Sequence, residues 1–332
     1  MNSIAAKRHF QHTGTEASHR GRKPGARLRG APRHIRGAPG IRRPRAGRRC
    51  NRGAIPATIE DMGNHSERAE RIWADIQRIR AEGPVIHNIT NYVAMNTTAN
   101  ALLAIGASPV MAHAEEEVEE MTAIARALVI NIGTLSTPWI AAMFKAGEAA
   151  RRNRRPIILD PVGAGATTFR TATARKLLAE LRPAILRGNA SEIRALADDE
   201  RSTRGVDSAY QPEDAVEAAD RLCARYGCVV AASGAVDVIS SGGTTTRVFN
   251  GHPMMPKVTG LGCTASALTG AFAAVNQSAR EAAVNAMAVM GIAGELAAED
   301  ARGPGTFLVR FLDALYRLTE SDIRERVQVR ES

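Results

Sequence analysis

The sequence predicts an α/β fold whose mainly parallel sheet is covered by helices on both faces, and two observations support this prediction. Short apolar runs alternate regularly with helical segments between residues 128 and 232. Short, fully apolar strands are typical of parallel strands buried on both faces, and each helix between them makes a crossover connection. Hydrophobic residues make up 44% of the 332 residues but aromatic residues only 4%, so aliphatic side chains must fill most of the core.

The segment before this alternation predicts three helices and one short strand. Residues 66–82 carry apolar side chains at helical spacing, and Pro84 then precedes a strand candidate at residues 85–86. Small residues at 91–105 predict a helix that ends at Gly106 as its C-cap. The acid-rich run at 114–127 predicts another helix, with its glutamates on a solvated face.

The alternation and the segments after it complete the expected fold. The predicted strands are residues 128–132, 156–159, 184–186 and 229–232, and the predicted helices are residues 138–153, 171–181, 190–197 and 212–226. Residues 237–240 and 246–249, separated by the Gly242 and Gly243 turn, predict an antiparallel hairpin. The last predicted helices are residues 262–275, 280–298 and 307–318. We find no internal repeat and therefore expect one α/β domain.

The charge of the chain is concentrated at its N-terminus. The net charge of +10 at face value favours a nucleic-acid partner. Residues 1–61, however, hold 15 basic and 3 acidic side chains, which leaves 29 basic and 31 acidic side chains for residues 62–332. We therefore divide the chain into an Arg-rich N-terminal extension, residues 1–61, and a nearly neutral α/β domain, residues 62–332.

We expect the extension to be disordered. Residues 1–56 are rich in Arg, Gly, Ala and Pro and lack periodicity, so they cannot bury enough apolar surface to fold. The extension could be an RNA-binding arm, a targeting segment, or a translated leader upstream of the true start. We favour the leader because Met62 directly precedes an amphipathic helix and the domain needs nothing before it. Nucleic-acid binding by the domain itself is not expected.

The cysteine pattern and the hydropathy predict a cytoplasmic protein. The chain has four scattered cysteines, Cys50, Cys223, Cys228 and Cys263. They suggest neither a disulfide framework nor a zinc site, so a reduced setting is expected. The N-terminus lacks the apolar stretch of a secretory signal. The apolar segment 282–298 is short for a membrane span and contains Asn285 and Glu295, which favours a buried helix.

Glycines and polar or charged residues follow the predicted strands, at the edge of the sheet where ligands bind in open α/β folds. Four such loops are residues 133–134, 160–165, 187–192 and 233–234. Asp160 and Glu192 could hold Mg²⁺ through oxygen or water contacts, and helix capping is the alternative for both. Arg187 could clamp a phosphate, and a surface salt bridge is its alternative. Four loops on one edge predict a site there.

The segment T-G-L-G-C-T at residues 259–264 carries the sharpest signal. Gly260 and Gly262 stand just before an Ala-rich helix, whose free amides and dipole favour an anion. Cys263 falls in the first turn, a position that lowers the pKa of a thiol. A glycine-rich helix start with a small buried Cys is the alternative. A peptidase-type nucleophile is disfavoured because no His has a recognisable partner context, and neither common nucleotide-binding motif is present.

The domain resembles the hydroxyethylthiazole kinases, which belong to the ribokinase-like superfamily and act in thiamine salvage. The matching stretches run in order through residues 66–320, at residues 87–93 (HNITNYV), 106–111 (GASPVM), 131–135 (NIGTL), 159–166 (LDPVGAGA), 187–192 (RGNASE), 205–207 (GVD), 251–252 (GH) and 258–263 (VTGLGC). The N-terminal extension has no counterpart in that family. Ser233 stands where Thr is usual, and Leu261 replaces a smaller residue between the two glycines.

This resemblance implies ATP-dependent phosphorylation of the hydroxyl of 4-methyl-5-(2-hydroxyethyl)thiazole by a homotrimer with sites at subunit interfaces. Carried over by position, the implied residues are Asn91, Met111 and Gly260 for the substrate, Arg187 and Ser233 for ATP, and Asp160 and Glu192 for Mg²⁺ and phosphate. The amides of Gly260 and Gly262 would stabilise the transferring phosphoryl group. Cys263 falls where the wider superfamily has an Asp base, so it would accept or orient the hydroxyl proton.

Three alternatives remain open on the sequence alone. A ribokinase-like domain could instead phosphorylate hydroxymethylpyrimidine or act as an ATP-dependent repair dehydratase, although the Met111 and Cys263 motifs argue against both. From another class, the Arg-rich extension could make the chain an RNA-binding protein with a degenerate kinase domain.

Overall fold

The computed structural model describes residues 59–198 and 212–331 of the chain. The chain divides into two units, residues 1–54 and 55–332, and every described residue belongs to the second. The disorder expected for residues 1–56 lies outside the described residues, and so do the roles weighed for the extension. The matching stretch at residues 205–207 lies outside them as well.

A nine-stranded sheet runs through the described part of the chain in the order β2-β1-β3-β4-β5-β6-β7-β8-β9. The strands are β1 (Val85–Ile89), β2 (Ser108–Val110), β3 (Ala127–Asn131), β4 (Ile157–Asp160), β5 (Ile185–Asn189), β6 (Val229–Ser233), β7 (Asp237–Ser241), β8 (Thr244–Val248) and β9 (Val329–Glu331). Neighbouring strands from β2 through β6 pair in parallel, whereas β7, β8 and β9 are added antiparallel. The predicted mainly parallel sheet and its hairpin are therefore confirmed.

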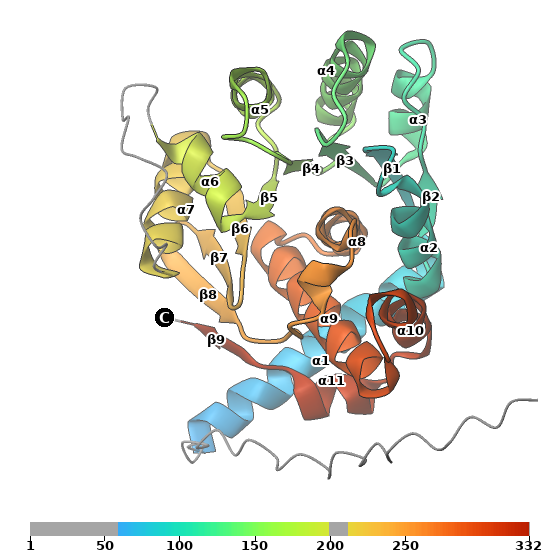
Figure 1. The fold of residues 1–332 in the computed structure, drawn as a ribbon, viewed down its shortest axis with the longest axis vertical. Coiled ribbons are helices and arrows are strands. Elements are labelled where there is room, and N and C mark those ends of the chain that lie inside the picture. The colour runs from blue at the N-terminus through green and yellow to red at the C-terminus, as the bar shows by residue number, and fades with distance from the viewer. Residues whose placement is uncertain (1–58, 199–211, 332) are drawn as a thin grey trace, which may run out of the picture. The chain divides into compact units, whose positions relative to one another are not determined.

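Helices cover both faces of this sheet, as Figure 1 shows. On one face lie α1 (Ile59–Glu82), α2 (Met95–Ile105), α8 (Leu261–Val275), α9 (Ala279–Asp300), α10 (Pro304–Arg317) and α11 (Glu320–Arg326). On the other lie α3 (Val118–Ile124), α4 (Thr137–Arg152), α5 (Thr168–Leu181), α6 (Ala190–Ala197) and α7 (Pro212–Tyr226). The strands divide their side chains between two apolar cores: Val129 packs on the side of α8, and Leu128 and Ile130 on the side of α4.

Helix α8 lies across the middle of the sheet because its small residues allow a close approach. A Cβ atom at Gly270 would come within 2.7 Å of Val129 Cγ2 and 3.2 Å of Ile86 Cγ2. The helix packs on β1, β3, β4 and β5 and buries most of its length. Its amino-terminal end therefore meets the carboxyl ends of the central strands, where the sequence places the site.

Helix α9 is long and apolar enough to cross a membrane, but 78% of its most apolar stretch is buried inside the protein. Asn285 is fully buried within it, and Glu295 accepts hydrogen bonds from the Asn250 side chain and the Gly251 amide. The helix is thus a core element, as the sequence predicted for residues 282–298.

Several boundaries differ from the prediction. Helix α1 begins at Ile59, before Met62, and α2 begins at Met95 rather than at residue 91. The edge strand β2, helix α11 and strand β9 were not predicted. These three elements are short and have no clear local apolar pattern. Pairing at the edges of the sheet stabilises β2 and β9, and packing against α1 and α9 stabilises α11.

Candidate active site

Three polar side chains meet at the carboxyl ends of adjacent strands. Asn131 ends β3 and is in register with Asp160, which ends β4. Asn91 follows β1, the neighbour of β3 on the other side. The amide of Asn91 donates to Asn131 Oδ1 at 2.8 Å, and the amide of Asn131 donates to Asp160 Oδ2 at 2.7 Å. All three side chains are buried, so this chain of hydrogen bonds is shielded from water.

Cys263 lies at the end of this chain, in the first turn of α8. Gly260 starts the helix with a φ of 84°, a left-handed conformation that glycine adopts without strain. The Asn91 amide donates its other hydrogen to Cys263 Sγ at 3.2 Å. The expectation that the helix start lowers the pKa of this thiol is wrong. Burial and the Asp160 carboxylate raise the pKa of Cys263, and the donors Asn91 and Asn131 offset this only in part.

Arg187 contacts both Ser233 and Gly262, the other two residues expected at the ATP site. It belongs to β5, is 6% exposed, and donates to the Gly262 carbonyl and to Ser233 Oγ, each at 2.9 Å. Ser233 ends β6, and its hydroxyl donates to the Gly188 carbonyl. Arg187 therefore holds the amino end of α8 against the ends of β5 and β6. It does not form the surface salt bridge that was the alternative.

Glu192 forms a capping box at the start of α6. One carboxylate oxygen accepts a hydrogen bond at 2.8 Å from the backbone N–H of Asn189, the residue that caps the start of α6. The other accepts from the Gly163 amide at 2.8 Å, which ties the loop after β4 to α6. The capping alternative for Glu192 is therefore present in the structure, while its contribution to a metal site stays a prediction.

Asp160 is held by two donors on one oxygen. Oδ2 accepts from Asn131 and from Ser266 Oγ at 2.7 Å, whereas Oδ1 is buried without a partner. Burial raises the pKa of Asp160 to about 6, against the opposing effect of Arg187. Among the described residues no group of three or more His, Cys, Asp or Glu side chains could hold a metal ion unaided.

Met111 is half-buried and follows β2, the outer neighbour of β1, so it lies at the same edge as Asn91. Its carbonyl accepts a hydrogen bond from His113 Nδ1 at 3.1 Å, and the His113 ring packs on Trp139. The Tyr92 ring also packs on Trp139. This aromatic group borders the expected substrate residues, and the role of Met111 in binding stays a prediction.

Sequence reasoning missed Asn131 and Arg170. Asn131 is the one polar residue of an otherwise apolar strand, a signal that could have found it. Arg170, in α5, donates to the carbonyls of Ile132, Gly133 and Val162 and so fixes the loops after β3 and β4. Its sequence context carries no comparable signal, because its three acceptors are backbone atoms.

A side chain at Gly133 is expected to collide with Asn91, because a Cβ atom there would lie 2.6 Å from Asn91 Nδ2 and 2.8 Å from Asn91 Cβ. We expect Gly133→Ala to displace Asn91 from Cys263, to destabilise the fold by about 1–3 kcal/mol, and to lower kcat/KM for the acceptor substrate about tenfold or more. Thermal unfolding and steady-state kinetics measure both effects. Gly305→Ala is the matched control, since nothing lies within 4 Å of that position. Equal effects of the two substitutions would contradict the assignment.

Asp237 gives the fold a pH dependence. Burial raises its pKa to about 6, although the Gly234 amide and Arg187 favour the charged form. A carboxyl whose pKa is raised by folding stabilises the native state at low pH, and this contribution is lost as the pH rises from about 4 to about 6. We therefore expect Asp237→Asn to be more stable than the parent protein at pH 8, by about 1–3 kcal/mol, and to lose this advantage near pH 4. Urea unfolding at the two pH values tests this expectation.

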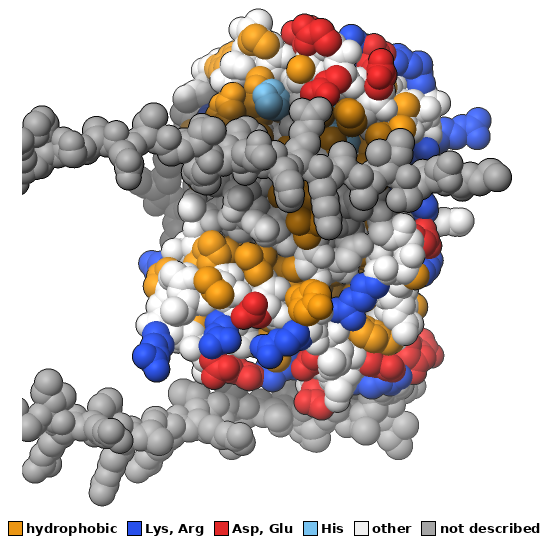
Figure 2. Space-filling view, turned by 90° about the vertical axis from the view of Figure 1, so that its right-hand side faces the viewer, with side chains coloured by type: hydrophobic (Ala, Val, Ile, Leu, Met, Phe, Trp, Pro, Cys, Tyr) orange, Lys and Arg blue, Asp and Glu red, His pale blue; other side chains and the backbone are white. Residues whose placement is uncertain are grey.

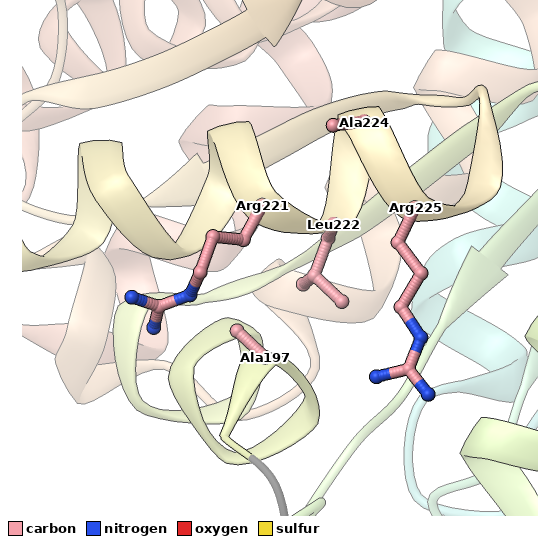
Figure 3. A pocket seen from close by; sticks show the side chains of 5 residues that line it. All are labelled: Ala197, Arg221, Leu222, Ala224 and Arg225. Atoms are coloured by element: carbon pink, nitrogen blue, oxygen red, sulfur yellow. The ribbon is translucent and has the colours of Figure 1, made fainter.

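A separate hollow lies between α6 and α7, lined by Ala197, Arg221, Leu222, Ala224 and Arg225 (Figure 3). Arg221 pairs with Glu217 and Asp198. None of the predicted site residues lines this hollow, so it is not the site described above.

Comparison with known proteins agrees with this geometry. The model of the hydroxyethylthiazole kinase family matches residues 76–321. A hydroxyethylthiazole kinase of Syntrophus aciditrophicus is 59% identical over 261 residues, which is 78% of this chain and 97% of that protein. One from Leptospira biflexa is 54% identical over 256 residues, 77% of this chain and 96% of the relative.

Solved structures show the same fold. The hydroxyethylthiazole kinase protein of Pyrococcus horikoshii has a TM-score of 0.74 at 47% identity, covering 79% of this chain and 99% of its own. A pyridoxal kinase of Staphylococcus aureus, solved with AMP-PCP and pyridoxal, has a TM-score of 0.53 at 16% identity and covers 75% and 97% of the two chains. The fold is therefore ribokinase-like.

Proposed function

The chain belongs to the hydroxyethylthiazole kinase family and phosphorylates hydroxyethylthiazole with ATP in thiamine salvage, and on this premise we propose that Cys263 handles the proton of the substrate hydroxyl. One observation carries this proposal: Cys263 Sγ lies in the first turn of α8, within hydrogen-bond distance of Asn91. The thiol thus stands between the helix amides and a fixed polar side chain. Phosphoryl transfer needs such positioning more than covalent chemistry.

The phosphoryl group itself meets the amino end of α8 in this proposal. The α8 helix has no side-chain cap, because Gly260 at the cap position offers none, so its first amides are free for an anion. Arg187 holds the same end through Gly262, and its Nε is buried without a partner. A buried cation and free amides are what a phosphate chain requires, which supports Arg187, Ser233 and Gly262 as the ATP-binding residues.

The donor set fits a magnesium ion that reaches the site with the nucleotide. Mg²⁺ usually takes one or two carboxylates, water and substrate phosphates as ligands. Asp160 Oδ1 is buried without a partner, and Glu192 is near enough to raise the pKa of Asp160. Asp160 and Glu192 would therefore hold the ion, which neutralises charge on the phosphates when bound. Asp160 also fixes Asn131, and Glu192 also fixes the loop after β4.

Glu192→Gln tests the metal assignment. The amide removes one negative charge but keeps the size of the side chain, so we expect the Mg²⁺ concentration for half-maximal turnover to rise severalfold. A magnesium titration at saturating ATP measures this, and thermal unfolding controls for the lost capping contact. If the variant loses stability but keeps the magnesium dependence of the parent protein, Glu192 acts only as a helix-capping residue.

The acceptor pocket would be formed by Asn91, Met111 and Gly260. The thioether of Met111 is polarisable and packs well on a flat aromatic ring such as a thiazole. ATP consumption by the full chain, measured with and without hydroxyethylthiazole, tests the proposed activity. Consumption that does not depend on the thiazole would contradict it.

We also propose a cytoplasmic homotrimer with its sites at subunit interfaces. Tyr92 and Val93, beside Asn91, are 66% and 62% exposed, and adjacent exposed apolar side chains can mark an interaction site. Further exposed apolar side chains lie on α2, α3 and α10, namely Leu103, Ile124, Val309 and Tyr316. Figure 2 shows several groups of hydrophobic side chains on the face that contains these helices, interspersed with charged ones. Light scattering should give three times the chain mass, and a monomer would contradict the proposal. The free thiols of Cys223, Cys228 and Cys263 suit a reducing compartment.

A further inference from the structure

The hydrogen bonds between Asp160 and Cys263 have only one possible direction. A carboxylate is an acceptor, so the Asn131 side chain must turn its NH₂ group towards Asp160 Oδ2. Its oxygen then faces the other way, where two donors meet it: the Asn91 amide at 2.8 Å and the Gly133 amide at 2.9 Å. Both ends of the Asn131 side chain are therefore determined by their partners.

The orientation of Asn91 follows from that of Asn131. Its NH₂ group must face Asn131 Oδ1, and its own oxygen accepts from the Ala94 amide at 3.0 Å. One hydrogen of the NH₂ group is used by Asn131, and the other points to Cys263 Sγ at 3.2 Å. If Asn91 were flipped, its oxygen would face both Asn131 Oδ1 and the sulfur. Asp160, acting through Asn131, and the Ala94 amide thus favour the same orientation of Asn91, the one that directs an N–H at Cys263.

We propose that Asn131 is a positioning residue for phosphoryl transfer. Its NH₂ group faces Asp160 and its oxygen accepts from Asn91, and this arrangement keeps an N–H donor of Asn91 on Cys263 Sγ. This inference rests on the proposed role of Cys263 as the group that handles the hydroxyl proton. A donor on sulfur stabilises the thiolate more than the thiol, since hydrogen bonds to charged groups are the stronger ones. Asn131 therefore makes Cys263 a better proton acceptor without touching the substrate.

The geometry explains why such help is needed. Cys263 lies in a buried environment near the Asp160 carboxylate, and both oppose a negative charge on sulfur. The helix start alone does not overcome them. Donors from Asn91, and from Asn131 behind it, act against this opposition.

The test measures thiolate formation directly. We expect Asn131→Leu, which keeps the branching at Cγ but has no polar atoms, to slow the alkylation of Cys263 by iodoacetamide at pH 8 about threefold or more. The pH midpoint of alkylation should move upward by the corresponding half pH unit or more. The full chain is used without ATP or magnesium, and mass spectrometry of the Cys263 peptide separates it from the other cysteines. A similar fall is expected in kcat.

Asn88→Leu is the matched control. Asn88 is a fully buried amide on β1, next to β3, but it donates to the Ile86 carbonyl and takes no part in the chain to Cys263. The same substitution there should leave the alkylation midpoint of Cys263 unchanged. If Asn131→Leu does not fold, Asn131→Ala takes its place, because it removes both polar atoms without adding volume.

Two outcomes overturn the inference: an unchanged alkylation midpoint in a folded Asn131 variant, or an equal shift in Asn88→Leu. Failure of the proposed function is distinguishable from both, because it appears as an unchanged kcat in Cys263→Ala. Slowed alkylation in the Asn131 variant would then still support the oriented chain, and only its use in catalysis would be lost.

Discussion

Cys263→Ala is expected to lower kcat about a hundredfold or more, within the range that general-base help contributes, with little change in the KM for hydroxyethylthiazole. The reason is that the thiol lies at the amino end of α8, where the proton of the substrate hydroxyl must go, rather than among the apolar groups that hold the ring. The substitution removes one sulfur atom from a half-buried position, so thermal unfolding should change little. Steady-state kinetics with both substrates measure the split between kcat and KM. Unchanged turnover would remove Cys263 from the mechanism.

The pH dependence separates a base from a simple contact. Because burial and Asp160 raise the pKa of Cys263 above its ordinary value, the thiolate fraction grows through the whole range from pH 7 to pH 9. We therefore expect kcat of the parent protein to rise with pH over that range. Cys263→Asp should remain active and lose this rise, since a carboxylate is already ionised there. A folded but inactive Cys263→Asp protein would argue against a proton acceptor at this position.

The sequence was a sufficient guide wherever a local pattern decides the structure. The alternation of apolar strands and helices predicted the central sheet, since strands buried on both faces must be apolar throughout. The sequence also indicates the helix start at Gly260, because a left-handed backbone conformation just before an Ala-rich helix favours glycine. Residues at the carboxyl ends of strands on one sheet edge had to converge, and Arg187 and Ser233 do so, beside Gly262 of α8.

The sequence does not predict which side chains from distant segments come into contact. Nothing in the sequence near Asn131 says that it will accept from Asn91 and donate to Asp160, because three strand ends must first be brought together. The pKa of Cys263 was expected to fall from its place on a helix, and the opposite holds because tertiary burial and the Asp160 carboxylate raise it. Both failures concern the environment of a residue rather than its type.

Arg187→Lys is the second large effect that the structure predicts, and it follows from the shape of the guanidinium rather than from its charge. Arg187 uses two nitrogens at once, one for the Gly262 carbonyl and one for Ser233 Oγ, each at 2.9 Å. Lysine keeps the positive charge but offers a single ammonium group on a flexible stem, so it cannot reproduce this planar pair of contacts. The amino end of α8 would then lose its tie to β5 and β6.

We expect this variant to lower kcat/KM for ATP about tenfold to a hundredfold, because the amides of α8 and the cation would no longer be held around the phosphates. The KM for hydroxyethylthiazole should change much less, since Asn91 and Gly260 are positioned by other contacts. Ser233→Ala gives a graded comparison: it removes one of the two acceptors, itself a proposed ATP contact, but leaves Arg187 hydrogen-bonded to Gly262, so its effect on kcat/KM for ATP should be several times smaller. If Arg187→Lys instead affected both substrates equally, Arg187 would support the fold of the whole sheet edge rather than the nucleotide site. If Arg187→Lys kept normal kinetics for ATP, charge alone would suffice there, and the tie between α8 and the two strands would have no part in phosphoryl transfer.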